Sequence, residues 1–598
     1  MQVLSGHSRW GFNISEALAG MGSTIRENAD AVITETTGGI ERVLFAFEYC
    51  GALPAGNNAW QRHGRAYSFG QAGVPYFIYN EIGGQELSFD RSIKAARFPN
   101  PAVPLSLVMF SRELGVAVLP VYEAAPSATK QELNGFEETL GDEGVLAYVQ
   151  DVVSGKSATA SLALLEKKAI RLGVLLAENR KRQDGYTGEV WKARLDAEDA
   201  VQFYLDNKRI WKLRAGEKVQ VSPRARNTFD WLNEQYPAAM GSPSLRFAVL
   251  NNQERVGFST FLGQQYPEMS AAFSSWLGES DQPLAIALVT GFKPRGDDSR
   301  PDRGLVPLAR MLSGQNAELL TFVTGPGKAS MYERIRKSPE KASTSNGLLQ
   351  SVFACSDWVL LDTVHEDAAT LVDSRTFKSV RNTQTPILPG ELAMPPLGEH
   401  DIDAMFHYAC TAPDRPGVFE GMCNPPGGDW SGVNLKLKDG RVARWTSLPR
   451  VSGTKRPDHI LQTNVAGEEI ILTVESKQNF RDLETGIGPS LKSFVTTLIS
   501  TETAVVREQQ DYEWSRARPA VKAPGSALYS LAIAADGPRV DLGEVISEKQ
   551  LDFAFAFSIE SKTEAKVRVA AAPRVSHMLS ELAEVLFAES ALDFKISE

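Results

Sequence analysis

The chain has 598 residues, too many for one hydrophobic core, and at about 100 to 200 residues per domain this length indicates three or four domains. A net charge of −10 and an apolar fraction of 43% are typical of a soluble globular protein. They exclude a protein that coats nucleic acid through bulk positive charge, but not one with a local binding groove. We expect no membrane span and no secretory signal, and four scattered cysteines favour the cytoplasm.

Residues 1–150 are predicted to form an α/β domain. Strand patterns at 31–34 and 42–50 flank a glycine turn, and a helical pattern at 58–71 precedes another strand near 74–84. The apolar run between 101 and 127 predicts two further strands, buried on both faces of a mixed sheet.

The next two segments differ in pattern. Residues 151–280 are mainly helical, with an amphipathic helix at 158–182 and another helix at 196–212, which favours a recognition or linker domain. From 281 to 400 strand and helix patterns alternate, which predicts an α/β segment.

An exposed loop at 293–304, KPRGDDSRPDRG, interleaves arginines with aspartates. Arg295, Arg300 and Arg303 are candidates for contacts with DNA phosphates or bases. A structural network of arginine and aspartate explains the same pattern equally well, so both interpretations stay open.

The most informative stretch is 456–495, within a segment 401–598 that we treat as one domain. Residues 469–474, EIILTV, follow the turn residues of 464–467 and predict the second strand of a hairpin. Because side chains alternate along a strand, Glu475 and Lys477 project from the same face. Pairing across the hairpin would bring Asp458 close to Glu475.

Two carboxylates this close repel each other unless a cation lies between them, and such a site suits Mg²⁺. Pro457-Asp458 followed by Glu475-Ser476-Lys477 resembles the PD-(D/E)XK nuclease superfamily, to which most restriction endonucleases belong. The resemblance implies a restriction-endonuclease-like mixed sheet flanked by helices. It also implies Mg²⁺ bound by Asp458 and Glu475, with Lys477 activating or placing water and Gln478 lining the scissile phosphate.

A second Glu-Ser-Lys occurs at Glu560–Lys562, and we treat it as a coincidence. It has no Pro-Asp on a neighbouring strand, and an alternating strand pattern follows it. After Lys477, by contrast, apolar residues recur at near-helical spacing from 479 to 498, and strand, carboxylate, lysine and helix is the superfamily's order.

The segment before the site, 429–456, is basic and contains a predicted hairpin. A phosphodiester substrate needs such positive charge beside the metal. The candidate DNA-binding residues here are Lys436, Lys438, Arg441, Arg444 and Lys455.

The N-terminal domain repeats part of the C-terminal pattern. Asp30 and Glu48 would be its two carboxylates, but Cys50 stands where a lysine is expected. One interpretation is a divergent nuclease-like fold that is degenerate or uses Gln61 or Arg65 instead of the lysine. The other is a plain strand with a structural glutamate and a buried thiol.

The function we expect is that of a Mg²⁺-dependent endonuclease of restriction-modification type, acting on double-stranded DNA. A homodimer is one arrangement that supplies two sites for two strands. A non-catalytic DNA-binding or assembly subunit of a defence or repair complex is the alternative. Cleavage of RNA or single strands has less support, because no stacking-aromatic motif is evident.

Overall fold

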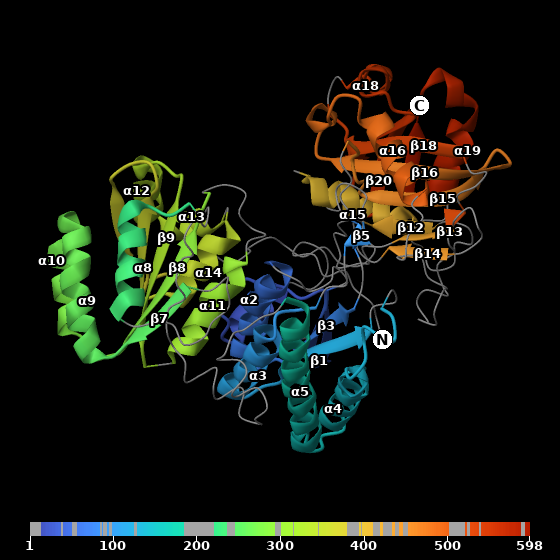
Figure 1. Ribbon diagram of the computed structural model, residues 1–598. Helices are drawn as coiled ribbons and strands as arrows, with labels where there is room; N and C mark the ends of the chain where they lie inside the picture. The colour runs from blue at the N-terminus through green and yellow to red at the C-terminus, as the bar shows by residue number, and fades with distance from the viewer. Residues whose placement is uncertain are drawn as a thin grey trace.

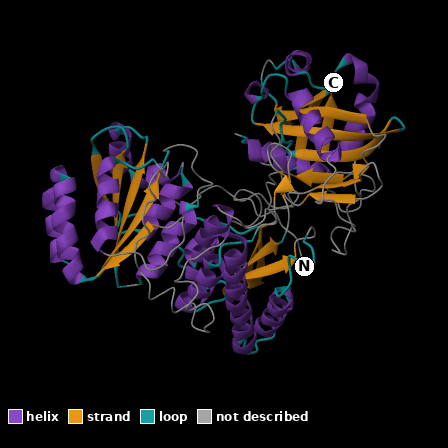
Figure 2. Ribbon diagram, viewed as in Figure 1, coloured by secondary structure: helices purple, strands orange, loops and turns teal. Residues whose placement is uncertain are grey.

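The protein is a multidomain, mixed α/β chain, as predicted from the sequence (Figures 1 and 2). The computed structural model describes residues 14–597 except 38–39, 51–56, 84–85, 88–92, 95–97, 125–127, 185–219, 236–245, 294–300, 315, 345, 379–393, 396, 411–418, 423–432, 437–441, 446–452, 501–520, 523–526, 538–539 and 588–592. Within these residues, no helix combines the length and the apolar character that crossing a bilayer requires.

The N-terminal unit is built on a four-stranded sheet of order β1-β2-β3-β6. Its strands are β1 (Ala31–Thr37), β2 (Ile40–Cys50), β3 (Tyr76–Ile82) and β6 (Val118–Ala124), with a separate short pair, β4 (Glu86–Leu87) and β5 (Ile93–Lys94). Its helices are α1 (Ile14–Gly20), α2 (Asn57–Gln71), α3 (Ala102–Leu114), α4 (Glu143–Val153) and α5 (Thr159–Asp184). Strands β2, β3 and β6 run parallel, and α2 and α3 connect them.

The prediction of two strands between 101 and 127 is wrong in its first half. Residues 102–114 form helix α3, and only the second half is a strand, β6. Every residue from Ala102 to Ser111 is buried, because α3 lies between the sheet, α2 and α5. A helix buried on all sides has no polar face, so its apolar run cannot be distinguished from a buried strand by periodicity.

The central unit is a five-stranded sheet of order β11-β10-β9-β8-β7. Its strands are β7 (Arg246–Leu250), β8 (Leu284–Thr290), β9 (Glu318–Gly325), β10 (Trp358–Thr363) and β11 (Ala369–Asp373). Its helices are α8 (Pro223–Gln235), α9 (Asn252–Gln265), α10 (Ser270–Glu279), α11 (Asp302–Ser313), α12 (Ala329–Lys337), α13 (Pro339–Thr344) and α14 (Gly347–Cys355).

The sheets divide the chain differently from the expected domains. Strand β7 pairs with β8, so the boundary expected at 280 falls inside one sheet. Helix α5, which begins the segment 151–280, packs on α3 and β6 of the N-terminal unit instead. The segment therefore contributes to two units, because its helices bury their apolar faces against different sheets. The helix predicted at 196–212 lies outside the described residues.

The N-terminal and central units pack together through α2 and α11, which lie side by side (Figure 1). The backbones approach closely at two glycines. A Cβ atom on Gly304 would lie 1.7 Å from the carbonyl oxygen of Trp60, and one on Gly64 would lie 2.7 Å from that of Arg303. One apolar core therefore extends across both units.

The C-terminal unit is a seven-stranded mixed sheet of order β12-β15-β16-β18-β19-β20-β21. Its strands are β12 (Phe419–Met422), β15 (His459–Val465), β16 (Glu468–Lys477), β18 (Ala527–Ala535), β19 (Phe553–Ile559), β20 (Glu564–Ala571) and β21 (Asp593–Ser597). A small sheet contains β13 (Val433–Lys436), β14 (Val442–Trp445) and β17 (Val521–Lys522). The helices are α15 (Glu399–Cys410), α16 (Ile487–Ser500), α18 (Leu542–Lys549) and α19 (Leu579–Phe587).

The predicted hairpin is present as β15 and β16. Ala466 and Gly467 connect the two strands and both have positive φ, 52° and 77°, as a two-residue hairpin turn requires. The helix predicted after Lys477 is also present, although it begins later, at Ile487, after a short 3₁₀ turn. Parallel strand β18 follows it, so α16 is a crossover between two neighbouring strands.

Candidate active site

The register of the hairpin brings the predicted carboxylates together. His459 pairs with Val474, so the next position of each strand places Asp458 opposite Glu475. The backbone N–H of Asp458 donates to the carbonyl of Val474, which extends the ladder to this pair. Lys477 lies on the same face, with its Nζ 3.0 Å from Oε1 of Glu475. The alternation predicted from the sequence is confirmed at these residues.

Glu475 is the most buried member of the site, with 1% of its surface exposed. Its Oε1 lies near two ammonium groups, those of Lys477 and of Lys455, the second at 3.2 Å. Its Oε2 is buried and has no hydrogen-bond partner among the described residues. Since a buried carboxylate oxygen without a partner is costly, this atom is a natural ligand for a cation.

Asp458 lacks a cation of its own. Its Oδ2 accepts a hydrogen bond of 2.7 Å from the backbone N–H of Ser476, and no lysine or arginine of the described chain forms an ion pair with it. Burial, the charge of Glu475 and the charge of Asp403 raise the pKa of Asp458 to about 7. Because burial and neighbouring negative charges disfavour the ionised form of Asp458, a positive charge nearby would stabilise that form.

Lys477 is held between two carboxylates. Its Nζ donates to Oε1 of Glu399, the first residue of α15, at 2.8 Å. Burial opposes the charge of Lys477, but Glu399 and Glu475 outweigh it and raise the pKa of this lysine. Lys477 is therefore an ammonium group at neutral pH, and in this arrangement it cannot accept a proton from water.

The opposite face of the hairpin is fixed by Asp403 of α15. Oδ1 of Asp403 accepts a hydrogen bond of 2.6 Å from the hydroxyl of Ser476. The same oxygen lies 2.6 Å from Nε2 of His459. His459 and Ser476 each follow a residue of the site, so their side chains point to the other face. Asp403 thus sets the position of both strands behind Asp458 and Glu475.

The sequence matches no known family model, and no curated protein is significantly similar to it.

Three contributors to the site have roles that the sequence did not reveal. Glu399 and Asp403 lie on α15, each more than fifty positions before Asp458, and no spacing rule connects them to the hairpin. Lys455 was predicted as a DNA contact but lies on Glu475. The only signal was its place three positions before Asp458, in the sequence Lys-Arg-Pro-Asp.

Two other predicted DNA-binding residues, Gln478 and Arg303, make contacts within the protein. Gln478 donates from Nε2 to the carbonyl of Leu397, which anchors the chain before α15 and leaves the phosphate-lining role unsupported. Arg303 lies on α11, mostly buried, and pairs with Glu27 at 2.5 Å, so it joins two units instead of facing DNA. Arg295, Arg300, Lys438 and Arg441 lie outside the described residues, as do the side chains of Lys436 and Arg444.

The second Glu-Ser-Lys is part of an exposed turn. Glu560 directly follows the last residue of β19, and its carboxylate pairs with Lys566 of β20 at 3.2 Å. Strand β20, not a helix, follows this motif, and β20 pairs antiparallel with β19. This motif makes a useful control for the first one.

The N-terminal candidates occupy a different environment. Glu48 is buried and pairs with Arg62 and Arg65 of α2, and Asp30 lies 3.6 Å from Arg65. Gln61 also lies on α2 and is half-buried. The side chain of Cys50 is outside the described residues.

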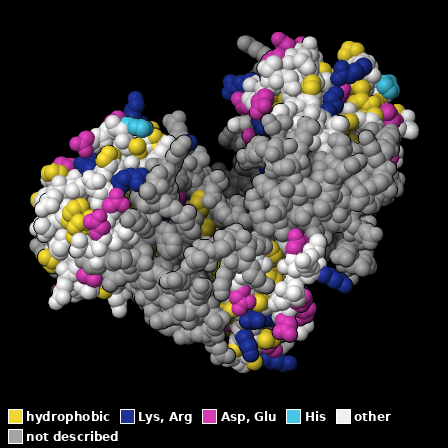
Figure 3. Space-filling view, viewed as in Figure 1, with side chains coloured by type: hydrophobic (Ala, Val, Ile, Leu, Met, Phe, Trp, Pro, Cys, Tyr) yellow, Lys and Arg dark blue, Asp and Glu magenta, His cyan; other side chains and the backbone are white. Residues whose placement is uncertain are grey.

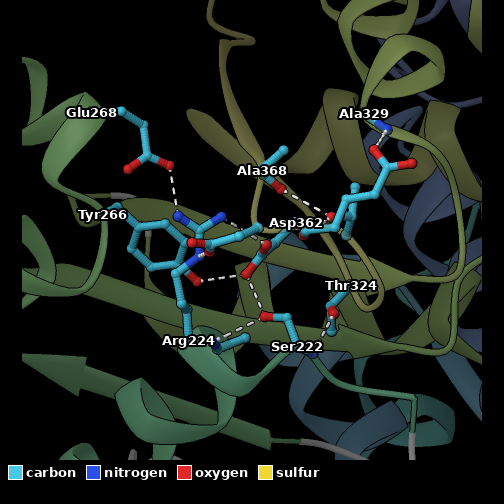
Figure 4. A network of polar contacts seen from close by, with 12 residues as sticks. Ser222, Arg224, Tyr266, Glu268, Thr324, Ala329, Asp362 and Ala368 are labelled. Atoms are coloured by element: carbon cyan, nitrogen blue, oxygen red, sulfur yellow. Dashed lines mark hydrogen bonds and ion pairs between the residues drawn. The ribbon is translucent and has the colours of Figure 1, made fainter.

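A third polar cluster lies at the carboxyl ends of the central strands (Figure 4). Asp362 of β10 accepts hydrogen bonds from the hydroxyls of Ser222 and Tyr266, the latter at 2.8 Å, and one of 3.3 Å from Arg224. Burial raises the pKa of Asp362 although these donors oppose the shift. Both of its oxygens are occupied by side chains, so we assign the cluster to holding α8 and the segment around Tyr266 against β10.

A divalent cation fits the C-terminal site better than the other two clusters. Mg²⁺ is commonly bound by one or two carboxylates and several waters, and Asp458 and Glu475 supply that set. Glu48 also has a buried oxygen without a hydrogen-bond partner among the described residues, but Arg65 lies between Glu48 and Asp30. Among the residues described, no group of three or more His, Cys, Asp or Glu side chains is arranged to hold a metal by itself. Water would have to complete the shell.

Proposed function

We propose that this protein is a Mg²⁺-dependent endonuclease of restriction type that hydrolyses phosphodiester bonds in DNA. One observation carries the proposal. Asp458 lies opposite Glu475, and Nζ of Lys477 lies 3.0 Å from Oε1 of Glu475. In the part of the chain that the structure describes, no lysine or arginine pairs with Asp458, and the buried Oε2 of Glu475 has no hydrogen-bond partner. The order of hairpin, helix α16 and parallel strand β18 also supports it.

The reaction needs the two carboxylates and the ammonium group at one phosphate. A divalent ion held by Asp458 and Glu475 would polarise a phosphoryl oxygen and lower the pKa of water. Asp458 must be ionised to bind it, since only the carboxylate is a ligand. Lys477, being protonated, stabilises the negative charge that grows on the phosphoryl oxygens and orients the attacking water.

The balance of the reaction is simple. The water oxygen forms a bond to phosphorus, one P–O ester bond breaks, and the leaving oxygen takes up a proton and becomes a hydroxyl group. Water supplies both protons that the products require, so no further reactant is involved. Glu399 keeps Lys477 in place, and Asp403 holds the strands that carry the carboxylates.

Substrate binding would depend on local charge. On the face shown in Figure 3, Lys and Arg side chains are interspersed with Asp and Glu side chains over the described surface. With a net charge of −10, the chain would bind DNA weakly without the metal. Binding should therefore strengthen when Mg²⁺ or Ca²⁺ is added.

The test compares the two Glu-Ser-Lys motifs. Asp458→Ala and Lys477→Ala should each lower Mg²⁺-dependent plasmid cleavage by at least about 100-fold and leave DNA binding measurable. Lys562→Ala, at the exposed turn, is the matched control and should cleave like wild type. Full activity of the Lys477 variant would move the site elsewhere. DNA binding without nicking, under Mg²⁺ or Mn²⁺ and on varied DNA, would instead support a non-catalytic DNA-binding subunit.

A further inference from the structure

Four neighbouring strands of the seven-stranded C-terminal sheet have the same topology as the four-stranded N-terminal sheet. In the N-terminal sheet, β1 and β2 form an antiparallel hairpin and β3 and β6 follow as parallel neighbours. In the C-terminal sheet, β15 and β16 form the hairpin and β18 and β19 are the parallel neighbours. A helix connects each parallel pair, α2 and α3 in one unit and α16 and α18 in the other.

The carboxylates occupy equivalent positions in the two hairpins. Ala31 pairs with Phe47, so the next position places Asp30 opposite Glu48. Asp458 and Glu475 are related in the same way, one position beyond the pair His459 and Val474. Both glutamates are buried, each with 1% of its surface exposed, and both lie near the carboxyl end of the second strand.

The two sites differ in the cations that accompany these carboxylates. At the C-terminal site the cation nearest along the strand is Lys477, two residues after Glu475. At the N-terminal site that position is Cys50, and the cations come from the crossover helix α2. Arg62 lies 3.2 Å from Oε1 of Glu48, and Arg65 contacts the same oxygen and lies 3.6 Å from Asp30.

Arg65 therefore stands between the two N-terminal carboxylates, where a divalent ion would have to bind. Although burial opposes its charge, Glu48 and Asp30 raise the pKa of Arg65, so the guanidinium is permanently charged. Two arginines balance the charge of two carboxylates, both of them at Oε1 of Glu48, while Oε2 has no hydrogen-bond partner among the described residues. A metal ion would have to displace a buried guanidinium and leave it without a partner, which is unfavourable. At the C-terminal site, no lysine or arginine among the described residues pairs with Asp458.

The central unit packs against the helix that supplies both arginines. Glu27, close to Asp30 in the chain, pairs with Arg303 of α11. Helix α2, which supplies both arginines, packs against α11 so tightly that only glycine fits at position 304. The helix that carries the arginines is thus fixed from both sides, by Glu48 and by α11.

We infer that the N-terminal unit is a second copy of the C-terminal fold in which Arg62 and Arg65 replace a divalent cation, so that each chain has a single metal-dependent centre. This inference rests on the proposed function of the C-terminal site. It implies that one bound chain hydrolyses one strand in one event. Duplex cleavage by a single chain then passes through a nicked intermediate.

Counting bound Mn²⁺ tests the inference without measuring activity. Electron paramagnetic resonance of free Mn²⁺ should show equal binding by wild type and by Asp30→Asn. The side chain of Asp30 is partly exposed. The isosteric variant Asp458→Asn/Glu475→Gln should weaken binding at least about 100-fold. Thermal melting checks that each variant is folded, and Asp458→Asn alone replaces the double variant if that one does not fold.

The outcomes separate the two claims. The assignment of Arg62 and Arg65 as replacements for a metal would be overturned if Asp458→Asn/Glu475→Gln bound Mn²⁺ as tightly as wild type and Asp30→Asn did not bind it. A wild type that binds no Mn²⁺, alone or with DNA, would overturn the proposed function, and the single metal centre with it. In plasmid cleavage at less than one chain per plasmid, nicked circles should appear before linear DNA. Linear product without nicked circles from a monomeric chain would contradict the inference.

Discussion

Lys455 places its Nζ 3.2 Å from Oε1 of Glu475, although Lys455 lies in the loop before β15 and Glu475 lies on β16. The backbone N–H of Lys455 donates to the carbonyl of Ser490 in α16, which anchors the residue. The side chain of Lys455 is about one-third exposed. If the site binds a metal as proposed, the ammonium group of Lys455 would compete with that metal for Glu475 and would turn toward a phosphate once the metal is bound.

Replacing Lys455 should therefore affect metal and DNA in opposite directions. Lys455→Met is expected to tighten Mn²⁺ binding about 3- to 10-fold, because it removes a competing charge, and to weaken DNA binding by a similar factor, because it removes a cation. Titrations with Mn²⁺ and with labelled duplex measure the two effects. Lys455→Arg keeps the charge and is the control. Parallel losses of both affinities would show a purely structural role.

Asp458 should destabilise the folded protein at high pH. Its pKa is raised to about 7 from the usual value near 4, so between these values the folded state binds more protons than the unfolded state. The free energy of unfolding therefore falls as pH rises through this window. Asp458→Asn, which still accepts from the N–H of Ser476, should raise stability at pH 8 by roughly 1–3 kcal/mol and change it little at pH 4.

Thermal melting in EDTA at both pH values checks this prediction. The Lys562→Ala variant should show no pH-dependent change relative to wild type. An Asp458→Asn variant that melts below wild type at pH 8 would mean that the carboxylate is already stabilised by a group we have not identified. The variant should be inactive at every pH, so stability and activity change in opposite directions.

Metal binding should depend on pH through the same residue. Because Asp458 must lose its proton before it binds a cation, affinity for Mn²⁺ should rise about tenfold per pH unit below the pKa of about 7 and level off above it. Titrations from pH 5.5 to 8.5 give the curve. Affinity that stays constant across this range would remove Asp458 from the set of metal ligands.

The contact between the N-terminal and central units should depend on Gly304. A Cβ atom there would lie 1.7 Å from the carbonyl oxygen of Trp60, which belongs to the backbone of α2 and cannot rotate away. Gly304→Ala should lower the melting temperature strongly, with a loss of at least about 2 kcal/mol. Gly257→Ala in helix α9 is the control, because a Cβ atom there meets nothing within 4 Å. It should be neutral or stabilise by up to about 1 kcal/mol.

The sequence by itself determined the local part of the site. Alternation along β16 places Glu475 and Lys477 on one face, and the turn at Ala466 and Gly467 sets the register that brings Asp458 opposite. These are short-range relations, fixed by backbone geometry over a few residues. The same reasoning separated Glu560 from Glu475, because the pattern that follows each of them differs.

Only the tertiary structure decided what surrounds the two hairpins. Glu399 and Asp403 reach the C-terminal site because α15 packs on the sheet. At the N-terminal site, Arg65 reaches Glu48 because α2 packs beside β2. Helix α3 was mistaken for a strand for a related reason, since complete burial removes the polar face that marks a helix. Contacts between distant segments depend on how apolar surfaces pack, and no spacing within the chain encodes them.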